Sequence, residues 1–355
     1  MNGDSLADKV RAGERINAAE ALTLYRELSL PALGALADSV RQRKHPERVV
    51  TYIVDRNINY TNVCDVFCTF CAFMRTEKDD DHYVLTPEQV GAKVQELVDN
   101  GGVQILMQGG HHPKLGIEYY LNLLHYIREK FPQVNIHGFS PPEFCHFAKV
   151  FGMSVADVIR RFKDAGLGSI PGGGAEILVE RVRGKIAPLK CTSDQWLGVM
   201  ETAHGLGLNS SATMMFGHIE TIEDRIEHLG RLRDLQDKTH GFTAFICWTF
   251  QPENTRLRAA TVGAHEYLRT QALGRIFLDN FPNVQSSWVT QGPQIGQVAL
   301  QFGANDFGSV MMEENVVSAA GTTFRINEAT MQRLIREMGY TPHRRNNWYQ
   351  LLNER

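Results

Sequence analysis

The chain has 355 residues, 43% hydrophobic and 22% charged, so it is long enough to bury a large core and has the composition of a globular protein. Its formal net charge is −3, and no basic stripe indicates a nucleic-acid surface. No apolar run approaches the roughly 18 residues of a membrane span, and the polar N-terminus lacks a signal-peptide core. We therefore expect a cytoplasmic protein with no nucleic-acid or membrane partner.

The first elements in chain order are predicted helices. Residues 1–46 contain no strand signal and show apolar side chains at helical spacing, as at Leu33, Leu36 and Val40. We interpret this segment as an N-terminal helical cap. After a β-branched run at residues 50–54, a further helix is predicted to begin at Thr86, because Thr86 and Gln89 have the spacing of a capping box.

From residue 50 onwards, predicted strands alternate with predicted helices. The strand candidates are residues 50–54, 103–107, 134–140, 167–171, 210–216, 242–250, 284–289 and 306–311. The helices between them are expected to begin at residue 86 and to lie near residues 117–130, 154–165, 193–205, 222–235, 264–280 and 293–302.

Such an alternation implies parallel strands with right-handed crossovers. About eight units in roughly 300 residues favour an α/β fold of the (β/α)₈ TIM-barrel type. A six-strand partial barrel with extra elements is the alternative. The barrel is expected to span residues 47–321, followed by a C-terminal helical extension at residues 322–355 that packs on it.

Polar or glycine-rich clusters directly follow most of the predicted strands. They comprise residues 55–57, 108–112, 140–143, 171–176, 216–220, 249–252 and 290–293. The active sites of barrel enzymes lie at the C-terminal ends of the strands, on the loops that follow. We therefore expect these clusters to converge at one mouth of the barrel.

Three of the six cysteines lie within eight residues, as Cys64, Cys68 and Cys71 with C-x₃-C-x₂-C spacing. Three thiolates so close together can bind three irons of one 4Fe–4S cluster, whereas most such clusters take four cysteines. The fourth iron would then be free to bind the amino and carboxylate groups of S-adenosylmethionine (SAM). A zinc site, the alternative, usually needs four protein ligands.

The remaining cysteines, Cys145, Cys191 and Cys247, are scattered along the chain. A second cluster would require them to converge in the fold. Free cysteines are often simply buried. We therefore expect these three to have no cofactor role.

The spacing of the three clustered cysteines, the aromatic Phe70 before the third, and their position after the first barrel strand resemble the signature of the radical SAM superfamily. The resemblance extends further. The stretches DRNINYTNVC, LMQGGHHP, HGFSPPE, GLGSIPGGGAEIL, ATMMFGHIE, WTFQP, SWVTQGP and EENVVSAAG, between about residues 55 and 321, are similar to the cyclases of the futalosine route to menaquinone.

This resemblance implies a reaction and its partners. A 5′-deoxyadenosyl radical would take hydrogen from the ribose of dehypoxanthinylfutalosine, and the resulting radical would add to the aromatic ring. A flavodoxin or ferredoxin is the implied electron donor, and a homodimer is compatible with the sequence. Aminofutalosine synthase and the deazaflavin-forming synthase are similar relatives that remain alternatives. A non-enzymatic iron–sulfur protein is a distant third.

Cofactor-binding candidates follow from the same resemblance. Many superfamily members carry Gly-Gly-Glu after the second strand, but here His111 follows Gly109 and Gly110. The glycine backbone can still contact SAM, while the glutamate position is vacant. We expect either that Glu176 takes over the contact to the SAM amino group or that it is an ordinary loop residue. Arg181 or Arg183 is the candidate for the SAM carboxylate, and a surface role is equally compatible.

Ring closure also needs a proton acceptor. His111, His112 and His218 are candidates because imidazole titrates near neutrality, and Glu143 is a further candidate at the predicted mouth. A structural role is the alternative for each. The sequence favours the adjacent pair His111 and His112 without deciding between them.

Overall fold

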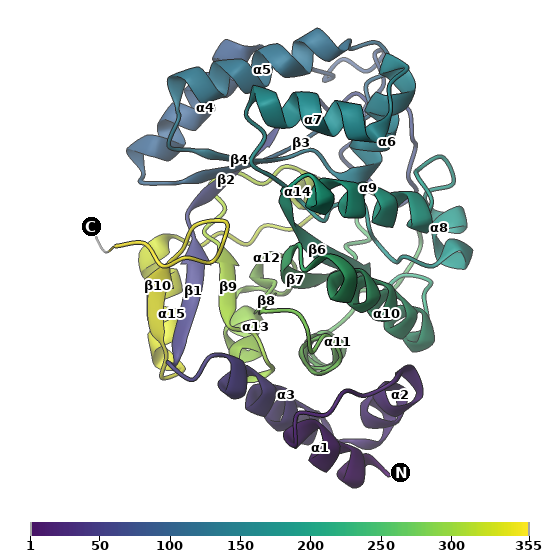
Figure 1. Cartoon of the computed structure of the whole chain (residues 1–355), viewed down its shortest axis with the longest axis vertical. Coiled ribbons are helices and arrows are strands. Elements are labelled where there is room, and N and C mark those ends of the chain that lie inside the picture. Colours follow the sequence, from purple (N-terminus) through teal and green to yellow (C-terminus); the bar gives the residue numbers. More distant parts are fainter. Residues whose placement is uncertain (1, 354–355) are drawn as a thin grey trace.

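The computed structural model describes residues 2–353. Three helices, α1 (Gly3–Arg11), α2 (Ala18–Glu27) and α3 (Leu30–Lys44), lie together beneath the rest of the molecule in Figure 1. Helices α2 and α3 pack on the outer helix α11 (Ala264–Phe277), and α1 packs on α2 and α3. Arg269 of α11 donates to the carbonyl of Leu28 at 3.0 Å, and Tyr25 donates to the Glu266 carboxylate at 2.8 Å. The N-terminal segment therefore covers the outside of the barrel, on the side of α11.

Within residues 2–353, ten parallel strands form one curled sheet in the order β10-β1-β9-β8-β7-β6-β5-β4-β3-β2. The strands are β1 (Val49–Ile53), β2 (Asp55–Asn59), β3 (Gln104–Gln108), β4 (Asn135–Gly138), β5 (Ser169–Ile170), β6 (Asn209–Phe216), β7 (Phe242–Thr249), β8 (Asn283–Gln285), β9 (Asp306–Ser309) and β10 (Thr341–Arg344). The parallel sheet and its intervening helices confirm the predicted α/β barrel class.

A break at Val54 divides one chain segment into two strands that pair in different parts of the sheet. Before the break, β1 pairs with β9 and β10; after it, β2 pairs with β3. Asp55 is aligned with Gln104 of β3, while its carbonyl accepts a hydrogen bond from the Met312 amide beyond β9 at 3.2 Å. The segment that begins the barrel therefore connects the β9 side of the sheet with the edge strand β2.

Helices between the strands complete the alternation. They are α4 (Pro87–Asp99), α5 (Ile117–Lys130), α6 (Pro141–Phe151), α7 (Val155–Ala165), α8 (Glu180–Ile186), α9 (Ser193–Gly205), α10 (Ile222–Thr239), α11, α12 (Trp288–Gln291), α13 (Pro293–Val298) with the 3₁₀ turn η1 (Ala299–Gln301), α14 (Val316–Ala319) and α15 (Glu328–Glu337). Two short ones, α12 and α14, line the interior of the barrel mouth. The capping box predicted for α4 is confirmed, because the Thr86 hydroxyl accepts from the Gln89 amide and the Gln89 side chain accepts from the Thr86 amide. None of the helices described between residues 2 and 353 combines the length and apolar character needed to cross a membrane.

The structure differs from the predicted elements in several places, and α8 and α14 were not predicted at all. Residues 55–57 were expected in a loop but belong to β2, where polar side chains face a cavity in place of the usual apolar core. Residues 141–143 form the first turn of α6, because Ser140 and Glu143 make a capping box and proline is tolerated there. Residues 288–289 begin α12 and do not extend a strand. The segment 322–355 was expected to be helical, yet after α15 it adds β10 to the sheet.

A buried ion pair attaches this C-terminal strand to the barrel. Arg345, directly after β10, donates through Nη2 to Oδ1 of Asp306 at 2.9 Å, and Thr51 of β1 donates to Oδ2 of the same carboxylate. Asp306 is fully buried, and Arg345 is 4% exposed. The pair therefore links β1, β9 and β10 inside the protein, where a charge without a partner is costly.

We expect Arg345→Met to lower the free energy of unfolding by about 3–5 kcal/mol, because it leaves the buried Asp306 carboxylate without its cation. Urea denaturation followed by circular dichroism measures this loss. Arg333→Met is the matched control, because it removes only the exposed pair with Glu337 on α15 and should cost about 0.2–0.5 kcal/mol. Equal losses in the two variants would contradict the role given to Arg345.

Candidate functional site

The loop that carries the cysteines leaves β2 and is held in place by its own backbone. The Cys64 amide donates to the Arg75 carbonyl at 2.9 Å, and the Arg75 amide donates to the Asn62 carbonyl at 2.8 Å. The Arg75 guanidinium donates to the carbonyls of Ala72 and Met74 and pairs with Asp81 at 2.8 Å. Residues 60–85 therefore form an ordered platform from a sequence with little regular structure.

The three predicted thiols line one cavity of about 270 Å³ at the C-terminal ends of the strands. Burial raises the pKa of Cys64 above its usual value and that of Cys68 to about 12. Among the described residues, the three sulfur atoms do not all lie within 4.8 Å of one another. With zinc–sulfur bonds of about 2.3 Å, two thiolates on one ion are at most about 4.6 Å apart.

Gly109 and Gly110 allow the loop after β3 to lie directly against the cysteine loop. A Cβ on Gly110 would be 2.1 Å from the carbonyl oxygen of Val63, and one on Gly109 would be 2.5 Å from the ring of Tyr60. The Gly110 amide donates to the carbonyl of Thr61 at 2.9 Å. Both predicted glycines therefore border the cavity, and their lack of a side chain sets the distance between the two loops.

Glu143 supports this contact from behind. Its Oε1 accepts from the Gly109 amide at 3.1 Å and from the Tyr60 hydroxyl at 2.7 Å. Its Oε2 accepts from the amide and the hydroxyl of Ser140 at 2.7 and 2.6 Å. Burial raises the pKa of this carboxyl group. Glu143 borders the cavity, as the sequence predicted. Because its two oxygens already accept four hydrogen bonds, this side chain positions the glycine loop.

Glu176 and Lys190 form a buried ion pair on the opposite wall of the cavity. Lys190 Nζ lies 2.6 Å from Glu176 Oε1 and 5.2 Å from the centre of the Phe70 ring. Burial opposes ionisation of Glu176, yet the charge of Lys190 and its hydrogen bond lower the pKa of this carboxyl group below its usual value. Glu176 and Phe70 were predicted to line the site. Lys190 was not, because it lies in a loop without a recognisable motif.

The backbone around Glu176 is tied down by a neighbouring arginine. Arg183 donates to the carbonyls of Gly174 and Ala175 at 3.1 and 2.6 Å and to the carbonyl of Cys191 at 2.6 Å. Arg181 has a different position: its side chain is half-exposed, pairs with Asp224 and does not border the cavity. The structure therefore gives no support for Arg181 as a ligand of SAM.

The three candidate histidines separate in space. His111 borders the cavity with the cysteines. His112, its neighbour in sequence, accepts from the Lys114 amide at 3.2 Å and lies away from that cavity. The ring of His218 donates from Nε2 to the Met215 carbonyl and accepts at Nδ1 from the Ile219 amide, so both of its nitrogens are engaged. Burial lowers the pKa of all three imidazoles, so each favours its neutral form.

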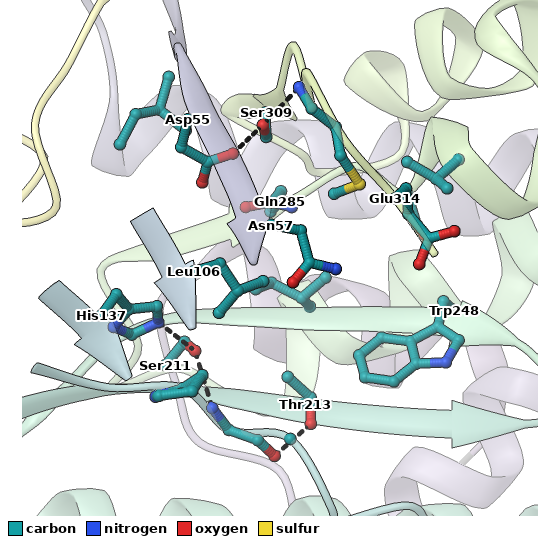
Figure 2. Close-up of a pocket in the computed structure, with 18 of the residues that line it drawn as sticks. Asp55, Asn57, Leu106, His137, Ser211, Thr213, Trp248, Gln285, Ser309 and Glu314 are labelled. Carbon is teal, nitrogen blue, oxygen red and sulfur yellow. Dashed lines mark hydrogen bonds between the residues drawn. The ribbon is translucent and has the colours of Figure 1, made fainter. Parts of the chain in front are cut away.

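A second cavity, also of about 270 Å³, lies deeper in the barrel (Figure 2). It shares Gln108, Gly173, Trp248, Val316 and Val317 with the cysteine cavity, so the two spaces adjoin. Polar side chains from several strands point into it, among them Asn57, His137, Ser211, Thr213 and Gln285. Thr249 and Gln251, singled out in the sequence, border the cysteine cavity instead. The barrel mouth therefore offers one space beside the thiols and a polar space below it.

Comparisons with known proteins agree with this arrangement. The profile of the radical SAM superfamily matches residues 58–232, and that of the CofH/MqnC C-terminal region matches residues 239–355. The chain is 46% identical to a cyclic dehypoxanthine futalosine synthase of Halalkalibacterium halodurans, over 99% of this chain and 95% of the relative. It is 48% identical to one of Streptomyces coelicolor, over 98% and 88%. An aminodeoxyfutalosine synthase of Thermus thermophilus is 40% identical, over 97% and 94%.

Solved structures show the same fold at low identity. Methylornithine synthase superposes with a TM-score of 0.72 at 19% identity, covering 95% of this chain and 97% of that one. The hydrogenase maturase HydG of Carboxydothermus hydrogenoformans gives a TM-score of 0.75 at 17% identity, covering 98% and 80%. Barrel, cysteine loop and adjoining cavities thus define a radical SAM type of protein. From its full-length relatives and both profiles, the chain belongs to the CofH/MqnC family of the radical SAM superfamily.

We expect Gly110→Ala to reduce the iron content of the reconstituted protein, because the new methyl group would push the backbone beside Cys64 outward. Overpacking of this kind costs about 1–3 kcal/mol. Iron and sulfide analysis after anaerobic reconstitution measures the effect. Gly198→Ala, in open space on α9, is the matched control and should keep full iron content. Full occupancy in both variants would show that the close approach at Gly110 is unimportant.

Proposed function

We propose that the chain is a radical SAM cyclase that converts dehypoxanthinylfutalosine to cyclic dehypoxanthinylfutalosine in menaquinone biosynthesis. The observation that carries the proposal is the 46% and 48% identity, over nearly the whole chain, to two proteins named cyclic dehypoxanthine futalosine synthase. The two adjoining cavities support it, because the reaction brings a cofactor and a separate small molecule together at one site.

Cys64, Cys68 and Cys71 are the residues that would hold the 4Fe–4S cluster. When bound there, the cluster and SAM supply a 5′-deoxyadenosyl radical for hydrogen abstraction from the ribose, which leads to addition to the aromatic ring. The protein itself contributes shape and shielding. The cysteine loop, the glycine loop and the segment around Glu176 form walls of the cavity, and Gly110 keeps the first two in contact. Walls of this kind limit the access of water to a reactive intermediate.

Glu176 is our candidate for the SAM amino group, in the role that the missing Gly-Gly-Glu glutamate would have. Its carboxylate stays ionised because Lys190 compensates its charge, and a charge-assisted hydrogen bond to an ammonium group is among the stronger polar contacts. The left-handed backbone at Glu176, with φ of 41°, is held by the hydrogen bonds from Arg183 to the neighbouring carbonyls. Gly109 and Gly110 would border the same ligand, and Phe70 would flank it.

The deeper cavity is our candidate for the substrate. Hydroxyl and amide groups of Asn57, Ser211, Thr213 and Gln285 suit the hydroxyls of a ribose, and Trp248, on the wall shared by both cavities, suits an aromatic ring. A one-electron donor such as flavodoxin or ferredoxin would supply the reducing equivalent. An adduct-forming reaction like that of an aminodeoxyfutalosine synthase is the second candidate, because one such relative is 40% identical.

Anaerobic incubation of the reconstituted enzyme with SAM, a reductant and dehypoxanthinylfutalosine tests the reaction. We expect a product lighter by two hydrogen atoms, formed in step with 5′-deoxyadenosine, because one hydrogen leaves to the radical and one as a proton with an electron. Mass spectrometry follows both species. If SAM is cleaved while this substrate stays unchanged, the cyclase assignment is wrong. A product that retains the deoxyadenosyl group would favour the adduct-forming alternative.

We expect Glu176→Gln to weaken SAM binding about tenfold or more, because a charge-assisted hydrogen bond contributes about 1.5–3 kcal/mol. Equilibrium binding of SAM to the reconstituted protein measures this, with iron content as a check that the cluster is intact. Glu201→Gln, on the surface of α9, is the control and should bind normally. An unchanged SAM affinity in the Glu176 variant, at full iron content, would remove this residue from the cofactor site.

A further inference from the structure

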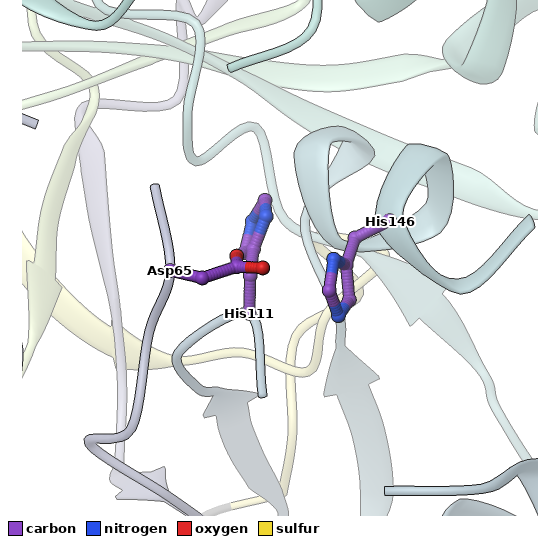
Figure 3. Close-up of side chains that lie close together, drawn as sticks. All are labelled: Asp65, His111 and His146. Carbon is purple, nitrogen blue, oxygen red and sulfur yellow. The ribbon is translucent and has the colours of Figure 1, made fainter. Parts of the chain in front are cut away.

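Three side chains from separate segments meet on the outer side of the cysteine loop (Figure 3). Asp65 directly follows the first cysteine, His111 follows the glycine pair after β3, and His146 lies on α6. Each offers one ligand atom, and these atoms all lie within 4.8 Å of one another. The two imidazole rings have centroids 4.9 Å apart at an angle of 39°. The group borders a cavity that is distinct from the two described above.

The hydrogen bonds of this group leave its lone pairs available. His146 Nε2 lies 3.0 Å from the carbonyl of His112, which can only accept, so the proton is on Nε2 and the lone pair is on Nδ1. The ring nitrogens of His111 have no hydrogen-bond partner within residues 2–353, although this residue is only 8% exposed. These nitrogens are not sealed off from solvent, so the imidazole of His111 is accessible from the adjoining cavity and available to a ligand there.

The carboxylate of Asp65 is also without a partner among the described residues. In the described part of the chain, the Asp65 carboxylate accepts no hydrogen bond and forms no ion pair, and Figure 3 shows it directed toward the two rings. The nearby cation Lys190, on the wall of the same cavity, is already paired with Glu176, so its charge is compensated. Two imidazole nitrogens and one carboxylate oxygen therefore face one another, and these are donor atoms that a divalent cation can bind.

We propose that Asp65, His111 and His146 bind one divalent transition-metal ion, with zinc(II) as the ion of best-matched chemistry. Two nitrogens and one oxygen are a donor set that zinc accepts in tetrahedral geometry, with the fourth position left to water. Bonds of about 2.0–2.2 Å require these side chains to move slightly closer together. The exposed Asp65 side chain has the freedom to do so. The hydrogen bond from His146 to the His112 carbonyl is the outer partner that metal-binding histidines usually have.

The ion would link three parts of the mouth: the cysteine loop, the glycine loop and α6. It would therefore restrain the backbone next to Cys64 from outside. A histidine that binds a metal through its lone pair cannot accept a proton at that nitrogen. With the metal bound, His111 would therefore not be the proton acceptor for ring closure. The inference does not depend on the substrate assigned above, because it concerns the outer face of the loop.

Zinc(II) binding to the reconstituted holoenzyme tests the proposal. Isothermal titration and metal analysis after dialysis should give one zinc per chain in addition to the cluster iron, and iron content should stay unchanged. His146→Ala and Asp65→Asn should each weaken zinc binding at least about tenfold. His125→Ala, an exposed histidine on α5, is the matched control and should bind as the unmodified protein does.

Two results would overturn the proposal. One is zinc binding that is equally strong in the unmodified protein and in both ligand variants, or that is absent from all three. The other is loss of zinc binding in Cys145→Ala, because Cys145 borders the same cavity and a thiolate would then be a ligand in place of the proposed set. Iron content in every variant separates a lost zinc site from a damaged cluster.

Discussion

The break at Val54 is the constraint on which the rest of the molecule depends. One segment of chain pairs with β9 before the break and with β3 after it, so it connects these two parts of the curled sheet. The interior created in this way is lined by polar groups of β2, such as Asp55 and Asn57, and remains a cavity instead of a packed core. The same segment then delivers the cysteine loop to the barrel mouth. The segment that connects the two parts of the sheet therefore also places the thiols.

Buried side chains fix the loops of the site against one another. Glu143 connects α6, the glycine loop and Tyr60 through four accepted hydrogen bonds, and Arg183 performs the equivalent task for the carbonyls beside Glu176. Both side chains are buried and each makes several hydrogen bonds, which rigidify a site far better than exposed ones do. Charged residues at this mouth thus serve mainly to position backbone, and glycine makes the close approach possible.

Sequence patterns reveal those features whose chemistry is local. The three cysteines were predicted because their identity and spacing are both within one loop, and α4 because Thr86 and Gln89 cap it within three residues. The strand β2 was not predicted, since a strand that faces a polar cavity lacks the apolar alternation on which such predictions depend. Lys190 escaped notice because its partner is fourteen positions away and only the fold brings the two together.

The adjacent histidines show the same limit more sharply. His111 and His112 are indistinguishable by composition and position, yet one borders the cysteine cavity while the other accepts a backbone hydrogen bond away from it. The neighbouring pair in the cysteine loop divides similarly: the thiol of Cys64 faces the inner cavity, whereas the carboxylate of Asp65 faces the outer one. His111 borders both spaces. The wall between them is therefore only one residue thick, so any group held on the outer face acts directly on the loop that carries the first cysteine.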